Sequence, residues 1–372
     1  MAEESPKTEA QRADDSQEEA REAAEQAGLI YVSDEEPGIS RRAVGSDFTY
    51  YNSQGVLIEN ERTLQRIRLL AVPPAYADVW ICSKPNGHIQ ATGRDARGRK
   101  QYRYHSRWTE ARDQTKYEQM IDFAAALPAL RSKINADMAK HGLPREKILA
   151  TIVYLLETTL IRVGNEGYAQ ENKSYGLTTL RNRHVAVDGG QLRFRFKGKS
   201  GKAWNLQIKD RRVARIIRAC QELPGQHLFE YVDEEGSPRS VGSSDVNDYL
   251  REATGRDITA KDFRTWHGTV LAAMALSEFE SFDSQALAKK NVRAAIERVA
   301  ARLGNTTTIC RKCYIHPEVL NSYLDGKLLE EIKVEVEAEL RDDLAQLRPE
   351  EAAVLALLNK RLKTEIGLRG AA

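Results

Sequence analysis

The chain has 372 residues, of which 30% are charged, and its formal net charge is +2. This length allows two domains, and no apolar run approaches the roughly 20 residues that span a bilayer. The N-terminus has no apolar leader, and four cysteines are too few for a disulfide framework, so we expect an intracellular, reduced protein without a membrane segment.

The charge is distributed unevenly along the chain. Residues 1–36 carry twelve acids and three bases, a net charge of −9, so the remainder carries +11. Residues 1–28 consist mainly of Glu, Ala, Gln, Asp and Ser, and we expect an acidic tail that is disordered or weakly helical. The basic remainder favours a polyanionic partner, although excess lysine and arginine can also merely keep a protein soluble.

Residues 29–108 predict a small, mainly antiparallel β-sheet domain. Short segments rich in β-branched and aromatic residues alternate with Gly, Pro and Asn. The predicted strands are Tyr31–Val32, Phe48–Tyr51, Gly55–Ile58, Val79–Cys82, His88–Thr92 and Gln101–Tyr104. A helix is predicted over Glu59–Leu70, because the two prolines Pro73 and Pro74 would stop it.

Residues 109–372 predict a mostly α-helical domain, because apolar residues recur there at helical spacing. The predicted helices are Thr109–Leu127, Pro128–His141, Arg145–Ile161, Lys209–Glu222, Ser243–Gly255, Thr259–Ser277 and Ser284–Leu303, then one from about Lys327 and one over Arg348–Gly367. Three strands joined by glycine turns interrupt them, at Val185–Val187, Gln191–Phe196 and Trp204–Ile208. The fold class is therefore α+β, with a small β-rich N-terminal domain and a mostly helical second domain that carries a three-stranded β-hairpin element.

Tyr314 lies in a run, Leu303–Pro317, that suits attack on a phosphodiester. Arg311 and Lys312 precede it, and the amide of Asn305 lies nine residues before it. A phenol has an ordinary pKa of roughly 10, and nearby positive charge favours the nucleophilic phenolate. The alternative is a half-buried tyrosine in a basic surface helix.

Residues 84–107 hold seven bases and one acid, with aromatic residues between them. Residues two apart in a strand share a face, so Tyr102 and Tyr104 point together. Gln101 can make a bidentate contact to adenine. The pattern predicts contact with DNA, and the alternative is that the tyrosines belong to the core. The bases are Lys84, Arg94, Arg97, Arg99, Lys100, Arg103 and Arg107.

A second basic cluster spans residues 181–217, with eleven bases and two acids. Lys197, Lys199 and Lys202 surround the turn over residues 198–201. A lysine at a hairpin tip can reach into a groove and donate a proton there. Simple phosphate binding is the alternative, and it suits Lys197 and Lys202.

Arg162 and Arg264 lie in largely apolar helical segments, where an arginine is costly unless it is paired. Both could be structural salt-bridge partners. Together with a hairpin lysine and Tyr314 they also match the groups needed for phosphoryl transfer to tyrosine. Two guanidinium groups would hold the nonbridging oxygens, and an acid would protonate the leaving oxygen.

Other motifs in the chain do not predict a metal or a nucleotide. Cys310 and Cys313 resemble half a zinc site or a redox pair, but no second pair exists. The segment Gly93–Gly98 lacks the spacing of a phosphate-binding loop, and His267 and His316 lack metal-ligand spacing.

Taken together, these segments resemble a type IB DNA topoisomerase of the small bacterial and poxviral kind, over roughly residues 29–320 or beyond. The resemblance implies that Tyr314 is the nucleophile, that Arg162 and Arg264 are the catalytic arginines, and that Lys199 is the general acid. Asn305 stands where viral members carry histidine and bacterial members carry asparagine. The segments that carry the resemblance are Pro73–Ile81, Gly87–Tyr104, Arg162–Asn165 with Tyr168, Tyr175–Leu180 and the Tyr314 run.

The resemblance also implies how such a protein acts. A monomer would form a C-shaped clamp around double-stranded DNA, in the cytoplasm with the nucleoid. It would cut one strand through a 3′-phosphotyrosine, let the strand rotate and reseal it, without ATP, metal or other cofactor. The DNA-contact residues would be Arg97, Arg99, Lys100, Gln101, Tyr102, Tyr104, Tyr168, Lys197 and Lys202.

Two alternatives remain at this point. A tyrosine recombinase or integrase shares the chemistry, but such enzymes usually begin with a helical domain, whereas residues 29–108 predict a sheet. A DNA-binding protein without catalysis is the other alternative.

Overall fold

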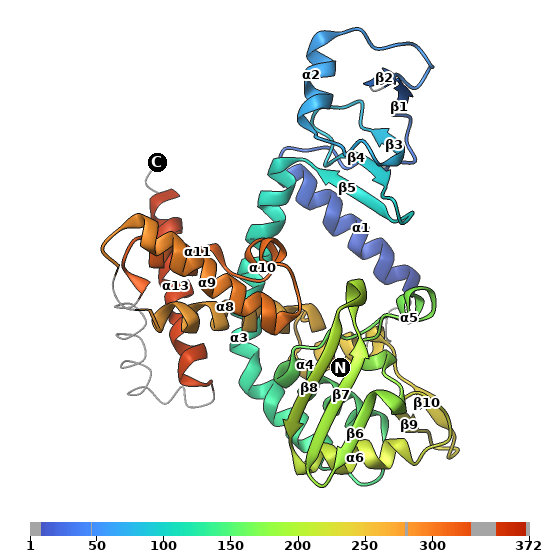
Figure 1. The fold of residues 1–372 in the computed structure, drawn as a ribbon, viewed down its shortest axis with the longest axis vertical. Helices are drawn as coiled ribbons and strands as arrows, with labels where there is room; N and C mark the ends of the chain where they lie inside the picture. The colour runs from blue at the N-terminus through green and yellow to red at the C-terminus, as the bar shows by residue number, and fades with distance from the viewer. Residues whose placement is uncertain (1–8, 46, 280–281, 329–346, 370–372) are drawn as a thin grey trace, which may run out of the picture. The chain divides into compact units, whose positions relative to one another are not determined.

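The computed structural model describes residues 9–45, 47–279, 282–328 and 347–369 (Figure 1). The chain divides into two compact units, Met1–Tyr117 and Glu118–Ala372. Helix α3, Ser106–Met138, belongs to both units. The predicted domain boundary at residue 108 falls at the beginning of this helix.

An antiparallel five-stranded sheet forms the first unit, in the order β2-β1-β3-β4-β5 (Figure 1). Its core face buries Ile39, Val79, Ile81 and Ala91 against Ile67 of the single short helix α2, Glu61–Leu69. The expected sheet domain is confirmed. The strands are β1 Ile39–Val44, β2 Asp47–Tyr51, β3 Ala77–Ile81, β4 Ile89–Arg94 and β5 Lys100–Tyr104.

Three details of this sheet differ from the sequence prediction. The predicted strand Gly55–Ile58 forms only one bridge, between Leu57 and Tyr51, because the chain returns to β2 through a tight turn. Strand β1 was not predicted, and it takes the place next to β2. The Tyr31–Val32 segment also lies outside the named strands.

The acidic N-terminal segment contains helix α1, Glu9–Gln26, rather than disorder over those residues. The reason is an alanine-rich stripe on an otherwise charged helix. Ala24 is fully buried with Leu29 and Trp108, and three further alanines pack against this cluster. The helical alternative is therefore correct for Glu9–Gln26.

The second unit is mostly helical and carries the predicted three-stranded antiparallel sheet, in the order β6-β7-β8. In β7 the alternate residues Leu192, Phe194 and Phe196 are buried, as the predicted period of two requires. The strands are β6 Val185–Asp188, β7 Gln191–Lys197 and β8 Ala203–Lys209, with a small hairpin of β9 Glu230–Val232 and β10 Pro238–Ser240.

The predicted helices of this unit are present, with one correction. Thr109–Leu127 and Pro128–His141 form the single helix α3, which continues through Pro128. The predicted helix from about Lys327 lies mostly outside the described residues. The remaining helices are α4 Arg145–Thr159, α5 Glu166–Asn172, α6 Arg211–Gln221, α7 Ser243–Thr254, α8 Ala260–Ser277, α9 Gln285–Leu303, α10 Thr307–Cys313, α11 Pro317–Leu324 and α13 Pro349–Arg369.

Candidate active site

Arg264 is the most deeply buried charged group of the site, with 3% of its surface exposed. It lies on α8 and donates from Nη1 to the carbonyl oxygen of Leu160 and from Nη2 to that of Leu303, the latter at 2.7 Å. Leu160 ends α4 in the left-handed conformation, with φ 59°, and Leu303 is the last residue of α9. Two helix ends therefore fix the guanidinium, while its buried Nε has no hydrogen-bond partner among the described residues.

Tyr314 ends the short helix α10 and lies against this guanidinium. The Arg264 Cζ atom is 5.1 Å from the centroid of the phenol ring. Burial raises the pKa of the Tyr314 phenol, but the charges and hydrogen bonds of Arg264 and Arg162 outweigh burial, so the pKa is lowered from its ordinary value. The site therefore favours the phenolate of this tyrosine.

Helix α8 approaches the Tyr314 backbone closely at Gly268. A Cβ atom at this position would lie 2.4 Å from the Tyr314 carbonyl oxygen. The next residue, Thr269, donates from Oγ1 to the Thr265 carbonyl at 2.9 Å, and this Oγ1 lies 3.4 Å from the Tyr314 carbonyl and accepts from the backbone N–H of His316 at 3.0 Å. Helix α8 therefore supplies the buried cation and also the surface against which the Tyr314 backbone packs.

Arg162 reaches the site from the segment that follows α4. Its Nη2 donates to Oδ1 of Asn305, whose buried Nδ2 lacks a hydrogen-bond partner in the described part of the chain. The backbone of Arg162 is held by Leu177, whose N–H donates to the Arg162 carbonyl at 2.9 Å. A side chain at Gly176 would lie 2.6 Å from that carbonyl, so the glycine permits the close approach.

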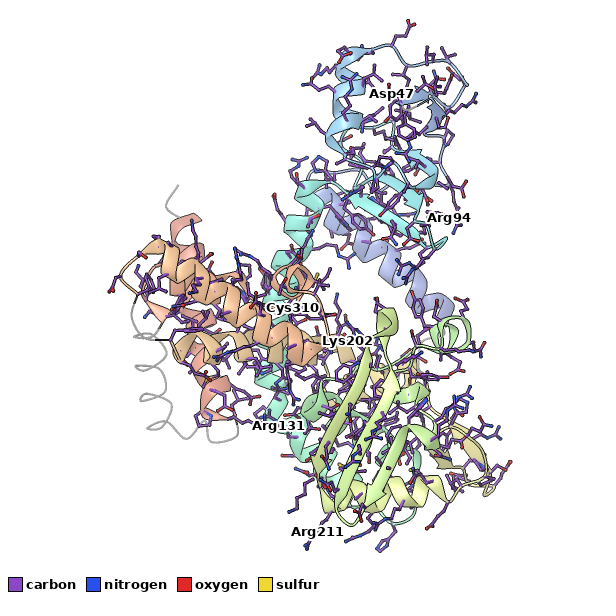
Figure 2. All side chains as sticks on the ribbon, in the orientation of Figure 1. Asp47, Arg94, Arg131, Lys202, Arg211 and Cys310 are labelled. Atoms are coloured by element: carbon purple, nitrogen blue, oxygen red, sulfur yellow. The ribbon has the colours of Figure 1, made fainter. Side chains whose placement is uncertain are left out.

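Lys199 is the one predicted catalytic residue that the structure does not bring to Tyr314. It occupies the turn between β7 and β8, is exposed, and has no side-chain hydrogen bond or ion pair among the described residues. The adjacent Ser200, with φ 62°, and Gly201, with φ 76°, form a left-handed turn. Lys197 and Lys202 are also exposed there, and Figure 2 labels Lys202.

The turn end of this hairpin also lies against the site. A Cβ atom at Gly304, one residue before Asn305, would lie 3.0 Å from the ring of Trp204 and 3.6 Å from Cδ of Lys202. The tip of the hairpin is thus packed against Gly304 through Trp204 and Lys202, while the Lys199 side chain is exposed. Tyr168, another predicted contact residue, is 56% exposed on α5, and its N–H donates to the cap residue Asn165 at 3.2 Å.

The predicted DNA-contact residues of the first unit gather on β5 and the turn before it. Tyr102 and Tyr104 are 44% and 43% exposed, and their rings stack with centroids 5.8 Å apart. Gln101 points to the other face of the strand and donates to Asp95 at 3.2 Å. Gln101 therefore lies on the opposite face of β5 from the tyrosine pair.

Acidic residues already pair with some of the predicted basic contacts. Lys100 forms a 2.6 Å ion pair with Asp34, and Arg99 forms one of 2.6 Å with Asp95. Hydrogen bonds from Arg99 lower the pKa of Asp95 to about 2. The Arg97 side chain is exposed, and its backbone N–H donates to Asp95.

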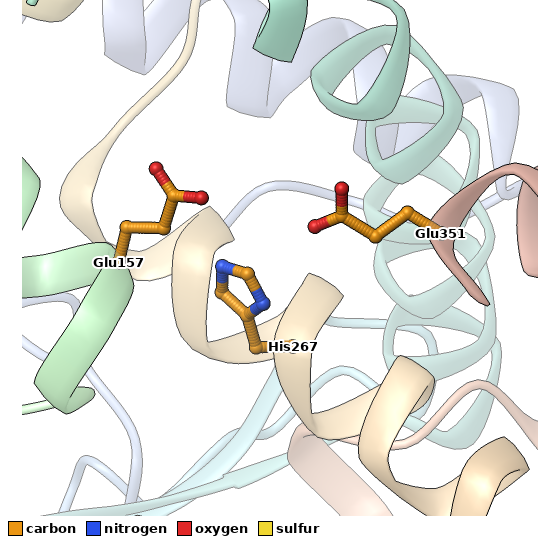
Figure 3. Close-up of side chains that lie close together, drawn as sticks. All are labelled: Glu157, His267 and Glu351. Atoms are coloured by element: carbon orange, nitrogen blue, oxygen red, sulfur yellow. The ribbon is translucent and has the colours of Figure 1, made fainter. Parts of the chain in front are cut away.

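A buried charged cluster lies elsewhere in the second unit, and sequence reasoning missed it. Glu157 of α4, His267 of α8 and Glu351 of α13 each place one ligand-type atom within 4.8 Å of the others (Figure 3). Arg131 of α3 binds both carboxylates at 2.7 and 2.8 Å, and Arg348 binds Glu157 at 3.3 Å.

These arginines pair with the two carboxylates, so the cluster holds four helices together. Burial lowers the pKa of His267, which keeps the imidazole neutral, and its Nε2 has no partner in the described region. The residues are separated by about a hundred positions in the chain, and no local motif could have predicted them. The helices that the structure describes include none long and apolar enough to cross a bilayer.

Two family models match separate parts of the chain. Residues 105–348 match the family described as eukaryotic DNA topoisomerase I, catalytic core, and residues 47–95 match bacterial DNA topoisomerase IB, N-terminal domain. DNA topoisomerase 1B of Acanthamoeba polyphaga mimivirus is 32% identical over 293 residues, covering 77% of this chain and 87% of the relative. DNA topoisomerase 1B of Vaccinia virus (strain Copenhagen) is 22% identical over 242 residues, covering 64% and 73%.

Proposed function

The chain belongs to the type IB DNA topoisomerase family, and from that premise we propose that Tyr314 is its nucleophile and that Arg162, Arg264 and Asn305 hold the phosphate. The activity is that of a DNA topoisomerase I, an isomerase that relaxes supercoiled duplex DNA through transient cleavage of one strand. The single observation that carries the residue assignment is the convergence of one phenol with two guanidinium groups. The recombinase and non-catalytic alternatives are set aside by family membership.

The first step is attack by Tyr314 on a backbone phosphate. The Tyr314 Oη forms a bond to phosphorus, the bond from phosphorus to the 5′-oxygen breaks, and a 3′-phosphotyrosine remains with a free 5′-hydroxyl. Arg264 and Arg162 lower the pKa of the phenol, which favours formation of the phenolate nucleophile. The ester conserves the energy of the broken bond, so resealing needs no ATP.

The charge that develops on phosphorus is met by donors that the fold has already fixed. Among the described residues the buried Nε–H of Arg264 and the buried Nδ2–H of Asn305 lack a hydrogen-bond partner, and Arg162 has guanidinium hydrogens beyond the one that it donates to Asn305. Unpaired buried donors are costly in a folded protein, and a bound phosphate would satisfy them. Such preorganised donors stabilise a pentavalent phosphate in the way a metal would otherwise do.

Lys199 is proposed as the acid that protonates the departing 5′-oxygen. Its position at an exposed hairpin tip means that it must approach the phosphate when DNA is bound. The left-handed turn at Ser200 and Gly201 supports this role, because it places an ammonium group on a short, narrow loop. Lys197 and Lys202 would contact neighbouring phosphates.

We also propose that the enzyme acts as a monomer that closes around the duplex, at the nucleoid. Tyr102 and Tyr104 would face DNA, together with Lys100, Arg97 and Arg99, and Tyr168 would contribute from the second unit. Gln101 would contact a base edge only after leaving Asp95.

Relaxation of plasmid DNA in EDTA without ATP tests the function. We expect both negatively and positively supercoiled plasmid to be relaxed. Tyr314→Phe should neither relax DNA nor form a covalent adduct, while its noncovalent affinity for duplex stays close to that of the parent enzyme. A covalent adduct in this variant would show that another tyrosine is the nucleophile.

A further inference from the structure

The acidic helix α1 lies over the face of the first unit that carries the exposed tyrosine pair. Ala20, Arg21 and Glu25 of α1 line the same pocket as Tyr102 and Tyr104, and the pocket has a volume of about 900 Å³. Docked α1 therefore occupies space next to the tyrosines through which a duplex would approach them.

The attachment of α1 is built mainly from small side chains. Ala24 is 0% exposed against Leu29 and Trp108, and the backbone carbonyl of Gly28 accepts from Arg107 Nη2 at 2.7 Å. Arg21 lies over the ring of Tyr31, with its Cζ 5.8 Å from the centroid. Alanine side chains bury little apolar area, so the docked helix is held by a modest free energy. Release and redocking are therefore accessible.

The charge of this segment is the same in sign as that of DNA. Helix α1 contains seven acids and two bases, and Glu18, Glu22 and Glu25 are exposed. Asp34, which follows the helix, holds Lys100 at 2.6 Å and accepts from Thr92 at 2.9 Å. The N-terminal segment thus occupies space on the proposed DNA face and also pairs one of its cations.

We propose that α1 is a built-in competitor of DNA, which must be displaced before the Tyr102 and Tyr104 face can bind the duplex. The proposal rests on the function assigned above to that face. DNA and the docked helix exclude each other through both volume and like charge. The apparent affinity for DNA is then reduced in proportion to the fraction of molecules in which α1 is released.

The test uses a substitution whose added charge and whose structural effect should change DNA affinity in opposite directions. Ala24→Glu places a carboxylate in the buried contact and should release α1. The added negative charge alone would weaken DNA binding, whereas release should tighten it, on the order of tenfold if about one molecule in ten is open. The matched control is Gln26→Glu, which adds the same charge at an exposed position of the same helix. It should bind slightly more weakly than the parent.

The readout is the dissociation constant of the full-length enzyme for a duplex oligonucleotide, measured by fluorescence anisotropy. Affinity of Ala24→Glu equal to or weaker than that of Gln26→Glu would overturn the proposal. Hydrogen exchange of the unmodified enzyme decides the matter even if the variant does not fold. Amides of residues 17–26 should exchange faster when DNA is bound, and unchanged or slower exchange would contradict displacement.

The proposed function of the face is tested separately. Tyr102→Ala should change the positions at which one duplex is cut. Unchanged cleavage positions would remove the assigned role of the face. If Tyr102→Ala changes the cleavage positions but Ala24→Glu does not tighten DNA binding, the role of the face is kept and the proposal that α1 competes with DNA is wrong.

Discussion

Gly268 offers the sharpest test of how closely Tyr314 must be held. A Cβ atom at this position would lie 2.4 Å from the Tyr314 carbonyl oxygen, whereas ordinary contact begins at 3.4 Å. In Gly268→Ala the Tyr314 backbone must therefore retreat by about 1 Å, since a packed interior offers no slack. A displacement of about this size can lower a rate on the order of a hundredfold.

The fold should survive this substitution, so the loss can be assigned to geometry. Replacing glycine by alanine inside a helix favours folding by about 1 kcal/mol. Overpacking opposes it by about 1–3 kcal/mol. The two effects nearly offset each other, and we expect a change in unfolding free energy of no more than about 2 kcal/mol.

The assay is single-turnover formation of the covalent adduct on a duplex oligonucleotide, quenched with detergent and resolved on a denaturing gel. Gly242→Ala is the matched control, because a Cβ atom there meets only ordinary contacts at 3.6 Å. We expect the control to cleave at the parental rate and Gly268→Ala to be about a hundredfold slower with unchanged DNA affinity. A folded Gly268→Ala enzyme that cleaves at the parental rate would refute the seating role of α8.

Three further predictions concern the acid, the phenol and a lysine that we propose contacts DNA. Lys199→Ala should slow cleavage of an ordinary phosphodiester but have much less effect on a substrate with a 5′-bridging sulfur. Arg162→Ala and Arg264→Ala should cleave both substrates slowly. Equal rescue of all three variants by the sulfur would contradict separate roles for the lysine and the arginines. Because the arginines lower the pKa of Tyr314, the cleavage rate should rise with pH up to that lowered pKa and then level. Arg162→Ala should move the rising part of this pH profile to higher pH. An unmoved profile would mean that Arg162 does not lower the pKa of the phenol. Removing one basic contact such as Lys197 should reduce the slope of log affinity against log salt by about 0.9, and an unchanged slope would mean that it touches no phosphate.

The sheet of the first unit shows where sequence patterns succeed and where they fail. Strands β3 to β5 were predicted because their apolar and aromatic residues mark them. Strand β1 was missed because its packing is done by arginines. Arg41 lies over the ring of Phe48 at 4.2 Å and donates to the carbonyl of Tyr76 at 2.6 Å, and Arg42 lies over Tyr51 at 4.3 Å. Guanidinium groups that stack on aromatic rings leave no hydrophobic period to detect.

The catalytic candidates divide in a similar way. Tyr314, Arg162, Arg264 and Asn305 could be proposed from residue type and resemblance, and the structure brings these four together. The residues that position them could not be proposed, because Gly268, Gly176 and Leu160 act through backbone contacts. A left-handed leucine or a glycine against a carbonyl has no signature in a single sequence.

The contacts of Arg264 explain why this position carries arginine rather than lysine. One guanidinium nitrogen donates to the carbonyl at the end of α4 and another to the carbonyl at the end of α9, while the buried Nε has no hydrogen-bond partner in the part of the chain that the structure describes. A guanidinium has five N–H donors in one plane, so two can fix its orientation and the others remain for a phosphate. An ammonium group has three rotatable donors and no plane, and the same two carbonyls would leave it one donor without a defined direction. The helix ends therefore give a long flexible side chain one orientation, with its single charge and its remaining donors fixed, and the same cation lowers the pKa of the phenol that it faces.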